Sequence, residues 1–136
     1  MKAVDANILV RYYTQDDARQ SGIATRVLAK EPESFVPDTV LIELYFVLRY
    51  AEKYLFDREK VGGVIRHLVN LPNVTVRDYE QVTAALDRQR HGIEFPDAFH
   101  LATSARCSEF LTFDDRRLAQ RARRARIKPR VTVPKA

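Results

Sequence analysis

Short apolar segments alternate with longer amphipathic segments along the whole chain, and this alternation restricts the fold more than any other feature. The short segments are typical of buried strands, and the longer ones have the spacing of helices. Strands separated by helices pair in parallel through right-handed crossovers, with helices on both faces of the sheet. The expected strands are residues 2–5, 34–37, 73–76, 109–113 and 131–133, and the expected helices are residues 8–13, 17–30, 38–52, 57–71, 78–90, 96–107 and 115–126.

The length of 136 residues indicates one α/β domain that covers residues 1–136. An apolar content of 46% and a charged content of 30% are typical of a soluble globular protein. The only cysteine, Cys107, excludes an internal disulfide and fits a reducing cytoplasm. No apolar run approaches the roughly 18 residues of a membrane span, and the first ten residues, MKAVDANILV, do not resemble a signal peptide. We therefore expect a cytoplasmic protein that does not contact membranes.

The net charge of +5 and the isoelectric point near 9.6 indicate a polyanionic partner. Residues 116–136 contain nine Lys or Arg and no Asp or Glu. This segment is either a solvated helix face with a basic tail or a patch that follows the phosphates of a nucleic acid. In the second interpretation the nucleic-acid-binding residues are Arg121, Arg123, Arg124 and Arg126.

Four acidic residues, Asp5, Glu43, Asp97 and Asp114, each lie beside an apolar segment. Asp5 ends the first expected strand and Asp114 follows the fourth, and Glu43 and Asp97 lie in early turns of expected helices. Ligands of open parallel sheets collect at the carboxyl ends of the strands, so all four side chains can face one rim. A carboxylate in apolar surroundings is unfavourable unless it has a partner.

Glu43 has no simple alternative role, because it lies well past the expected cap (Asp38 or Thr39) of an apolar helix. It is therefore either buried with a partner or at the wall of a cleft. The other three acids have local alternatives. Asp5 and Asp114 also suit helix caps, and Asp97, beside a proline, suits the first turn of a helix, where the macrodipole favours negative charge.

A cluster of these four carboxylates needs a cation. Two charges about 5 Å apart repel by roughly 3 kcal/mol at an effective dielectric constant near 20. Hard oxygen ligands favour Mg²⁺ or Mn²⁺ over zinc or copper. Such ions, held by carboxylates, support the hydrolysis of phosphodiesters. The four acids therefore predict a catalytic metal site.

Several other polar residues lie close to these acids in the sequence. Asn7 either orients Asp5 or forms a turn, and Thr112 precedes Asp114 by two residues, which places both on one side of a strand. Asp115 either replaces Asp114, acts as a ligand beside it, or is solvated. His100, one helical turn after Asp97, is expected to be packed and hydrogen-bonded, and Glu94 is expected to support the site from the preceding loop.

The segments VDANILVRY, VLIEL, GIEFPDAFHLA and LTFDDRRLA, in this order, resemble the PIN-domain ribonucleases and most closely the VapC toxins of toxin–antitoxin pairs. The resemblance covers essentially the whole chain. It implies a PIN-like domain with a five-stranded parallel sheet of order 3-2-1-4-5 and helices on both faces. It also implies cleavage of RNA that depends on Mg²⁺ or Mn²⁺.

By this resemblance, Asp5, Glu43, Asp97 and Asp114 fall on the acidic positions of the family. Asn7 and Thr112 fall on its polar supporting positions. The family also implies a homodimer and a VapB-like antitoxin partner. The apolar helix from residue 38 to residue 52 is then either buried on all sides within the monomer or binds a partner with part of its surface.

Three other functions remain open at this point. The same site in a PIN-type nuclease would cut single-stranded or flap DNA, or act in RNA processing. A receiver-like signalling module would place an acidic pair after the first strand and a Lys after the fifth, whereas this chain has only Asp5 after the first and no such Lys. A basic nucleic-acid-binding module with structural acids would bind without cleavage and without metal.

Overall fold

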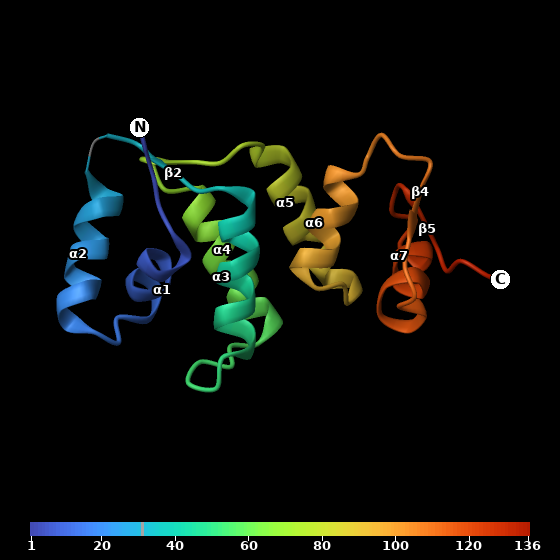
Figure 1. The fold of residues 1–136 in the computed structure, drawn as a ribbon, viewed down its shortest axis with the longest axis horizontal. Helices are drawn as coiled ribbons and strands as arrows, with labels where there is room; N and C mark the ends of the chain where they lie inside the picture. The colour runs from blue at the N-terminus through green and yellow to red at the C-terminus, as the bar shows by residue number, and fades with distance from the viewer. Residues whose placement is uncertain (31) are drawn as a thin grey trace. The chain divides into compact units, whose positions relative to one another are not determined.

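The computed structural model describes residues 1–30 and 32–136. These form two compact units, Met1–Tyr79 and Glu80–Ala136, which are described separately here (Figure 1). Both units combine helices with short parallel strands, so the expected α/β class is confirmed. The single domain over residues 1–136 stays a prediction.

The first unit is built from three strands of two residues each and four helices of nine to thirteen residues. The strands are shorter than expected. The helices lie close to their expected bounds. The elements are β1 (Lys2–Ala3), α1 (Ala6–Thr14), α2 (Ala18–Ala29), β2 (Ser34–Phe35), α3 (Asp38–Tyr50), α4 (Arg58–Val69) and β3 (Val74–Thr75).

The strands of the first unit form one parallel sheet with β2 in the centre. Ser34 is paired with Lys2 on one side and with Val74 on the other. Because all three strands point the same way, their carboxyl ends lie at one edge. Asp5 follows β1 at that edge, and α3 starts there after β2, which brings the helix with Glu43 to the same edge.

Local capping determines where the helices of the first unit begin. The carboxylates of Asp17 and Asp57 accept hydrogen bonds from the backbone N–H groups of Gln20 and Lys60 and so cap α2 and α4. The helix α3 differs from expectation, because Pro37 occupies its N-cap position, and Asp38 lies in its first turn. Asp38 is held there by Arg77, whose Nε lies 2.7 Å from Oδ2 of Asp38.

The helices α1 and α2 pack side by side, and α1 and α4 both pack against α3 (Figure 1). The contacts are made by apolar side chains that recur at helical spacing. On α3, Leu41, Leu44, Tyr45 and Leu48 are completely buried. Phe46 and Tyr50 of the same helix are about half exposed, so the expectation that α3 is buried on all sides is wrong. The alternative, that the exposed part of α3 binds a partner, stays a prediction.

The second unit contains a short 3-10 turn and one turn of π-helix among its helices. The expected helix of residues 115–126 is in fact this π turn followed by α7, and it ends at Arg124. The expected helix 96–107 ends earlier, at Thr103. The elements are α5 (Tyr79–Arg88), η1 (Gln89–His91), α6 (Phe95–Thr103), β4 (Glu109–Leu111), η2 (Asp115–Ala119), α7 (Gln120–Arg124) and β5 (Arg130–Thr132).

The strands β4 and β5 pair in parallel, with Phe110 opposite Val131. Among the described residues, the first unit has a three-stranded sheet and the second unit has a two-stranded sheet. The pairings β3–β2–β1 and β4–β5 agree with the expected order 3-2-1-4-5, and the union of these strands in one sheet of five stays a prediction. Within the described part of the chain, no helix is both long and apolar enough to cross a membrane.

Candidate active site

Asp5 lies between β1 and α1 at the carboxyl edge of the first sheet and is exposed. Its extended backbone makes it the N-cap of α1, and its Oδ1 accepts a hydrogen bond of 2.7 Å from the backbone N–H of Ala6. The capping role that the sequence left open is therefore real. It does not exclude a second role, because a carboxylate has about four lone-pair positions and this bond uses one.

Glu43 lies in the second turn of α3 and is also exposed. It lines a pocket of about 240 Å³, which α1 and α3 form together with the turn after α3. Asn7 of α1 lines the same pocket. Of the two roles expected for Glu43, the structure therefore shows the wall of a cleft and not a buried pair.

Asp97 lies in the first turn of α6 and is half-buried. Burial raises the pKa of Asp97, the nearby His100 lowers it, and the carboxylate of Asp114 raises it again. The structure thus brings Asp114 near enough for its charge to raise the pKa of Asp97. His100 itself is exposed, so the expectation of a packed histidine is wrong.

Glu94 precedes α6 and extends this acidic neighbourhood. Burial raises the pKa of Glu94, and the charge of Asp97 raises it further, whereas Arg121 and Arg117 lower it. Arg121 also donates a hydrogen bond to the backbone carbonyl of Gly92, two residues before Glu94. Gly92 has a φ of +83°, and a Cβ at this position would lie 3.2 Å from Nη1 of Arg121. A glycine therefore permits the contact that holds α7 against the segment before Asp97.

Asp114 and Asp115 are adjacent but have different surroundings. The carboxylate of Asp114 caps the π turn by accepting a hydrogen bond from the backbone N–H of Arg117, and its own N–H donates to the hydroxyl of Thr112. Asp115 accepts a hydrogen bond of 2.8 Å from the side chain of Gln120 and lies 3.5 Å from Nη2 of Arg123. Asp115 is thus bonded to its own helical segment, and Asp114 is the acid that influences Asp97.

The four basic candidates also differ from one another. Arg121 is bonded to Gly92 and is only partly exposed, and Arg123 is paired with Asp115. Arg124 is exposed at the end of α7. Arg126 lies beyond that helix in a left-handed conformation with φ of 56°. These four residues therefore do not form one continuous helical face.

The donor chemistry of the candidate site fits a divalent metal such as Mg²⁺ or Mn²⁺. All the candidate ligands are hard oxygens, and a cation would offset both the burial and the repulsion from Asp114 that raise the pKa of Asp97. Among the described residues, no three His, Cys, Asp or Glu side chains lie close enough together to hold an ion. Asp5 and Glu43 belong to the first unit and Asp97 and Asp114 to the second, so the convergence of all four stays a prediction.

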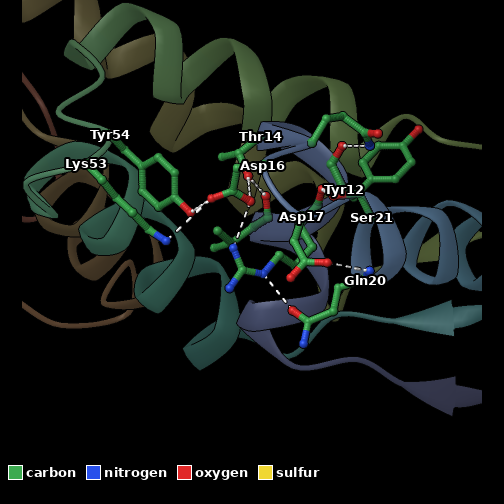
Figure 2. A network of polar contacts seen from close by, with 11 residues as sticks. Tyr12, Thr14, Asp16, Asp17, Gln20, Ser21, Lys53 and Tyr54 are labelled. Carbon is green, nitrogen blue, oxygen red and sulfur yellow. Dashed lines mark hydrogen bonds and ion pairs between the residues drawn. The ribbon is translucent and has the colours of Figure 1, made fainter.

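The sequence did not indicate a polar cluster beside Glu43. Arg11, Lys53 and Tyr54 line the same pocket as Glu43, and all three interact with Asp16 (Figure 2). Asp16 and Tyr54 are 38 residues apart in the chain. The available sequence signal was local only, since Arg11 lies one helical turn after Asn7 and an acidic pair, Asp16 and Asp17, follows the helix.

Comparison with known proteins gives a clear family but few relatives. No curated protein matches the chain. A solved structure, the Sarcin-Ricin loop cleaving toxin VapC20 of Mycobacterium tuberculosis, has 18% sequence identity and a TM-score of 0.41, and the match covers 88% of this chain and 95% of that one. Residues 2–124 match the family model of the PIN domain, as the sequence motifs predicted, and the chain therefore belongs to the PIN domain family.

Proposed function

We propose that this protein is a metal-dependent endoribonuclease that hydrolyses phosphodiester bonds of RNA. The observation that carries the proposal is the half-buried carboxylate of Asp97, whose pKa is raised by burial and by a second acid, Asp114. Acids whose pKa is shifted by burial and by a specific charged neighbour are concentrated at functional sites. The PIN family match extends over residues 2–124 and so includes all four candidate acids, Asp5, Glu43, Asp97 and Asp114.

In this proposal the four carboxylates hold Mg²⁺ or Mn²⁺. The chemistry that such an ion supplies is the polarisation of the phosphodiester and of the attacking water. The chain's own contribution is to orient the acids. The hydroxyl of Thr112 accepts a hydrogen bond from the backbone N–H of Asp114 and so fixes the start of the π turn, and Arg121 and Arg117 oppose the rise in the pKa of Glu94. Asn7 lines the pocket of Glu43, and we assign it the role of orienting a ligand there.

We further propose that the protein is the toxin of a toxin–antitoxin pair, as its motifs suggest. RNA is then the substrate, and the protein acts in the cytoplasm. A VapB-like antitoxin and a second copy of the chain are the expected protein partners. The exposed aromatic side chains of α3, Phe46 and Tyr50, support a protein partner, because exposed apolar side chains that lie together favour association.

The direct test is cleavage of a mixed tRNA and rRNA preparation by the purified protein, in Mg²⁺, in Mn²⁺ and in EDTA. One variant is taken from each unit, Glu43→Gln and Asp97→Asn, with Glu80→Gln as a control. Glu80 is an exposed acid in the first turn of α5, comparable in position with Asp97 in α6. We expect metal-dependent cleavage that both site variants lose and the control keeps.

Four outcomes would contradict parts of this proposal. Cleavage that persists in EDTA would exclude the metal mechanism. Full activity in both site variants would exclude the site. Preference for single-stranded or flap DNA in a competition assay would replace RNA as the substrate, and binding without cleavage in any condition would favour a nucleic-acid-binding module.

A further inference from the structure

The pocket beside Glu43 has one apolar side and one cationic side. Val10 of α1, Val47 of α3 and Ala51, which follows α3, contribute apolar surface. Arg11, Lys53 and Tyr54 contribute a guanidinium, an ammonium and an aromatic ring. Small-molecule sites combine apolar walls with a few placed polar groups in this way. The volume of about 240 Å³ is smaller than that of typical drug-sized sites and suits one small planar group with one anion.

The cationic side of the pocket is fixed by Asp16, which follows α1. Gln15 follows the last residue of the helix and adopts a left-handed conformation with φ of 52°. The chain changes direction there, and the carboxylate of Asp16 lies beside Arg11. Nη1 of Arg11 lies 2.8 Å from Oδ1 of Asp16, and Nε donates to the side chain of Gln20 at 2.8 Å. These two contacts determine the direction in which the guanidinium points, although a guanidinium has five N–H donors in all.

The second cation comes from the turn after α3. Backbone N–H groups of Tyr54 and Leu55 donate to the carbonyl of Ala51, and that of Phe56 donates to Leu48, so the turn is closed by three hydrogen bonds of 2.8–3.0 Å. The hydroxyl of Tyr54 donates to Oδ2 of Asp16 at 2.6 Å, and Nζ of Lys53 lies 3.5 Å from the same oxygen (Figure 2). The Lys53 ammonium also lies 5.1 Å from the centre of the Tyr54 ring.

One carboxylate therefore faces two cations. Hydrogen bonds from Tyr54, Arg11 and Thr14 lower the pKa of Asp16, so it is ionised at neutral pH. It balances only one of the two positive charges, and the Lys53 side chain is 62% exposed. The group of Arg11, Lys53 and Asp16 therefore keeps one positive charge that an anion can use, whereas the pocket as a whole, with Glu43 in its wall, has no net charge.

We propose that this pocket binds one unpaired nucleotide of the RNA, with its phosphate at Arg11 and Lys53 and its base against the Tyr54 ring and the apolar wall. The inference rests on the proposed nuclease function, since it assigns the substrate strand to the pocket that Glu43 lines. A base in a duplex is stacked and its groove edge is poorly accessible, so the site requires single-stranded RNA or a loop. Asp16 is a positioning residue that orients both cations.

The phosphate part is tested by binding of a short fluorescein-labelled single-stranded RNA, measured by anisotropy in EDTA as a function of salt. Lys53→Ala is compared with Lys60→Ala, because Lys60 is also an exposed lysine over an aromatic ring, 3.9 Å from the centre of Phe56, but it does not line this pocket. We expect Lys53→Ala to bind several-fold more weakly, with a salt slope smaller by about 0.7, the value for one phosphate contact on a single strand. Lys60→Ala should retain both values.

The base part is tested by the pair Tyr54→Phe and Tyr54→Leu. Both variants lose the hydrogen bond to Asp16, but only Tyr54→Phe keeps an aromatic ring. Stacking of a base on an aromatic side chain contributes about 1–3 kcal/mol, so Tyr54→Leu should bind single-stranded RNA roughly 5-fold or more weakly than Tyr54→Phe. The corresponding duplex should bind more weakly than the single strand.

The outcomes separate this inference from the nuclease proposal. If the protein cleaves RNA but Lys53→Ala and Lys60→Ala bind it equally, the nucleotide site is wrong and the nuclease stands. If binding depends on Lys53 and on the Tyr54 ring but no cleavage occurs, the nucleotide site stands and the nuclease is wrong. Equal affinity for duplex and single strand, or no binding of RNA at all, would overturn the inference.

Discussion

Asp16 and Asp97 are the same residue type in opposite electrostatic situations. Asp16 receives hydrogen bonds from Tyr54, Arg11 and Thr14, and these lower its pKa. Asp97 is half-buried beside another acid, and its pKa is raised. The first carboxylate is satisfied by the protein and holds a structure together. The second has a charge that its surroundings disfavour, and this difference is the reason for proposing a ligand site at Asp97.

The variant Asp97→Asn gives the largest expected effect and tests this contrast directly. Cleavage should fall by about 100-fold or more, because a metal ligand stabilises several kcal/mol of developing charge. The same variant should be more stable than wild type in the absence of metal. Since the pKa of Asp97 is raised in the folded state, its charged form destabilises the fold. This destabilisation develops as pH rises through the ordinary pKa of about 3.9.

Thermal melts of Asp97→Asn in metal-free buffer therefore provide the second measurement. We expect a higher melting temperature than wild type near neutral pH and no difference near pH 3 or below, where the wild-type acid is protonated in both states. A lower melting temperature at neutral pH would mean that Asp97 is a structural acid like Asp16.

The variant Gly92→Ala tests the support of the Asp97 region. A residue with a side chain in the left-handed region is less stable by about 1–2 kcal/mol, and the new Cβ would crowd Arg121. Denaturant unfolding should show a loss of this size, and cleavage should also fall. Gly63→Ala is the matched control, because nothing lies within 4 Å of its Cβ position within α4. It should be more stable than wild type by about 0.5–1 kcal/mol.

The variant Asp16→Asn should have a smaller effect, with the opposite dependence on pH. A lowered pKa means that Asp16 stabilises the fold above its ordinary pKa, and that this contribution is lost as pH falls. The variant should melt a few degrees lower at about neutral pH, since partly exposed ion pairs contribute little. The difference from wild type should shrink towards low pH. A constant difference at every pH would show that the ionisation of Asp16 is not involved.

The smallest expected effect is that of Tyr54→Phe on stability. It removes one of the three side chains that donate to Asp16 and keeps the ring in place. Its melting temperature should lie between those of wild type and Asp16→Asn at neutral pH. A loss as large as that of Asp16→Asn would show that Tyr54 alone organises the cluster.

The features that the sequence predicted correctly depend on neighbours along the chain. Asp17 and Asp57 cap helices through N–H groups three residues ahead, and such bonds follow from local spacing. The motif around Asp97 predicted the start of α6, and it was one of the motifs that indicated the family. The match of residues 2–124 to the PIN domain model confirms that family. Glu43 was identified because a carboxylate within an apolar helix is unfavourable unless it has a partner or faces a cleft, and Glu43 does line a pocket.

The features that the sequence did not predict depend on distant partners or on backbone details. The cluster of Asp16 requires a side chain 38 residues away. Pro37 rather than Asp38 occupies the N-cap position of α3, and Asp38 in the first turn is bonded to Arg77, which is 39 residues away in the chain. The π turn of Asp115–Ala119 and the left-handed Arg126 interrupt what the sequence suggested as one basic helix.

The turn that carries Lys53 and Tyr54 has a consequence for how such a protein can change over evolution. Backbone hydrogen bonds close this turn, and Tyr54 links it to Asp16 in the rest of the unit. Glu43 lies about two helical turns earlier, in α3. If Lys53 and Tyr54 bind the RNA and Glu43 acts in hydrolysis, the residues that select the RNA and those that cleave it lie in separate segments of the sequence. Substitutions or insertions in this turn would then alter which RNA is recognised and leave the hydrolytic residues intact, so new targets can arise by drift in one short segment.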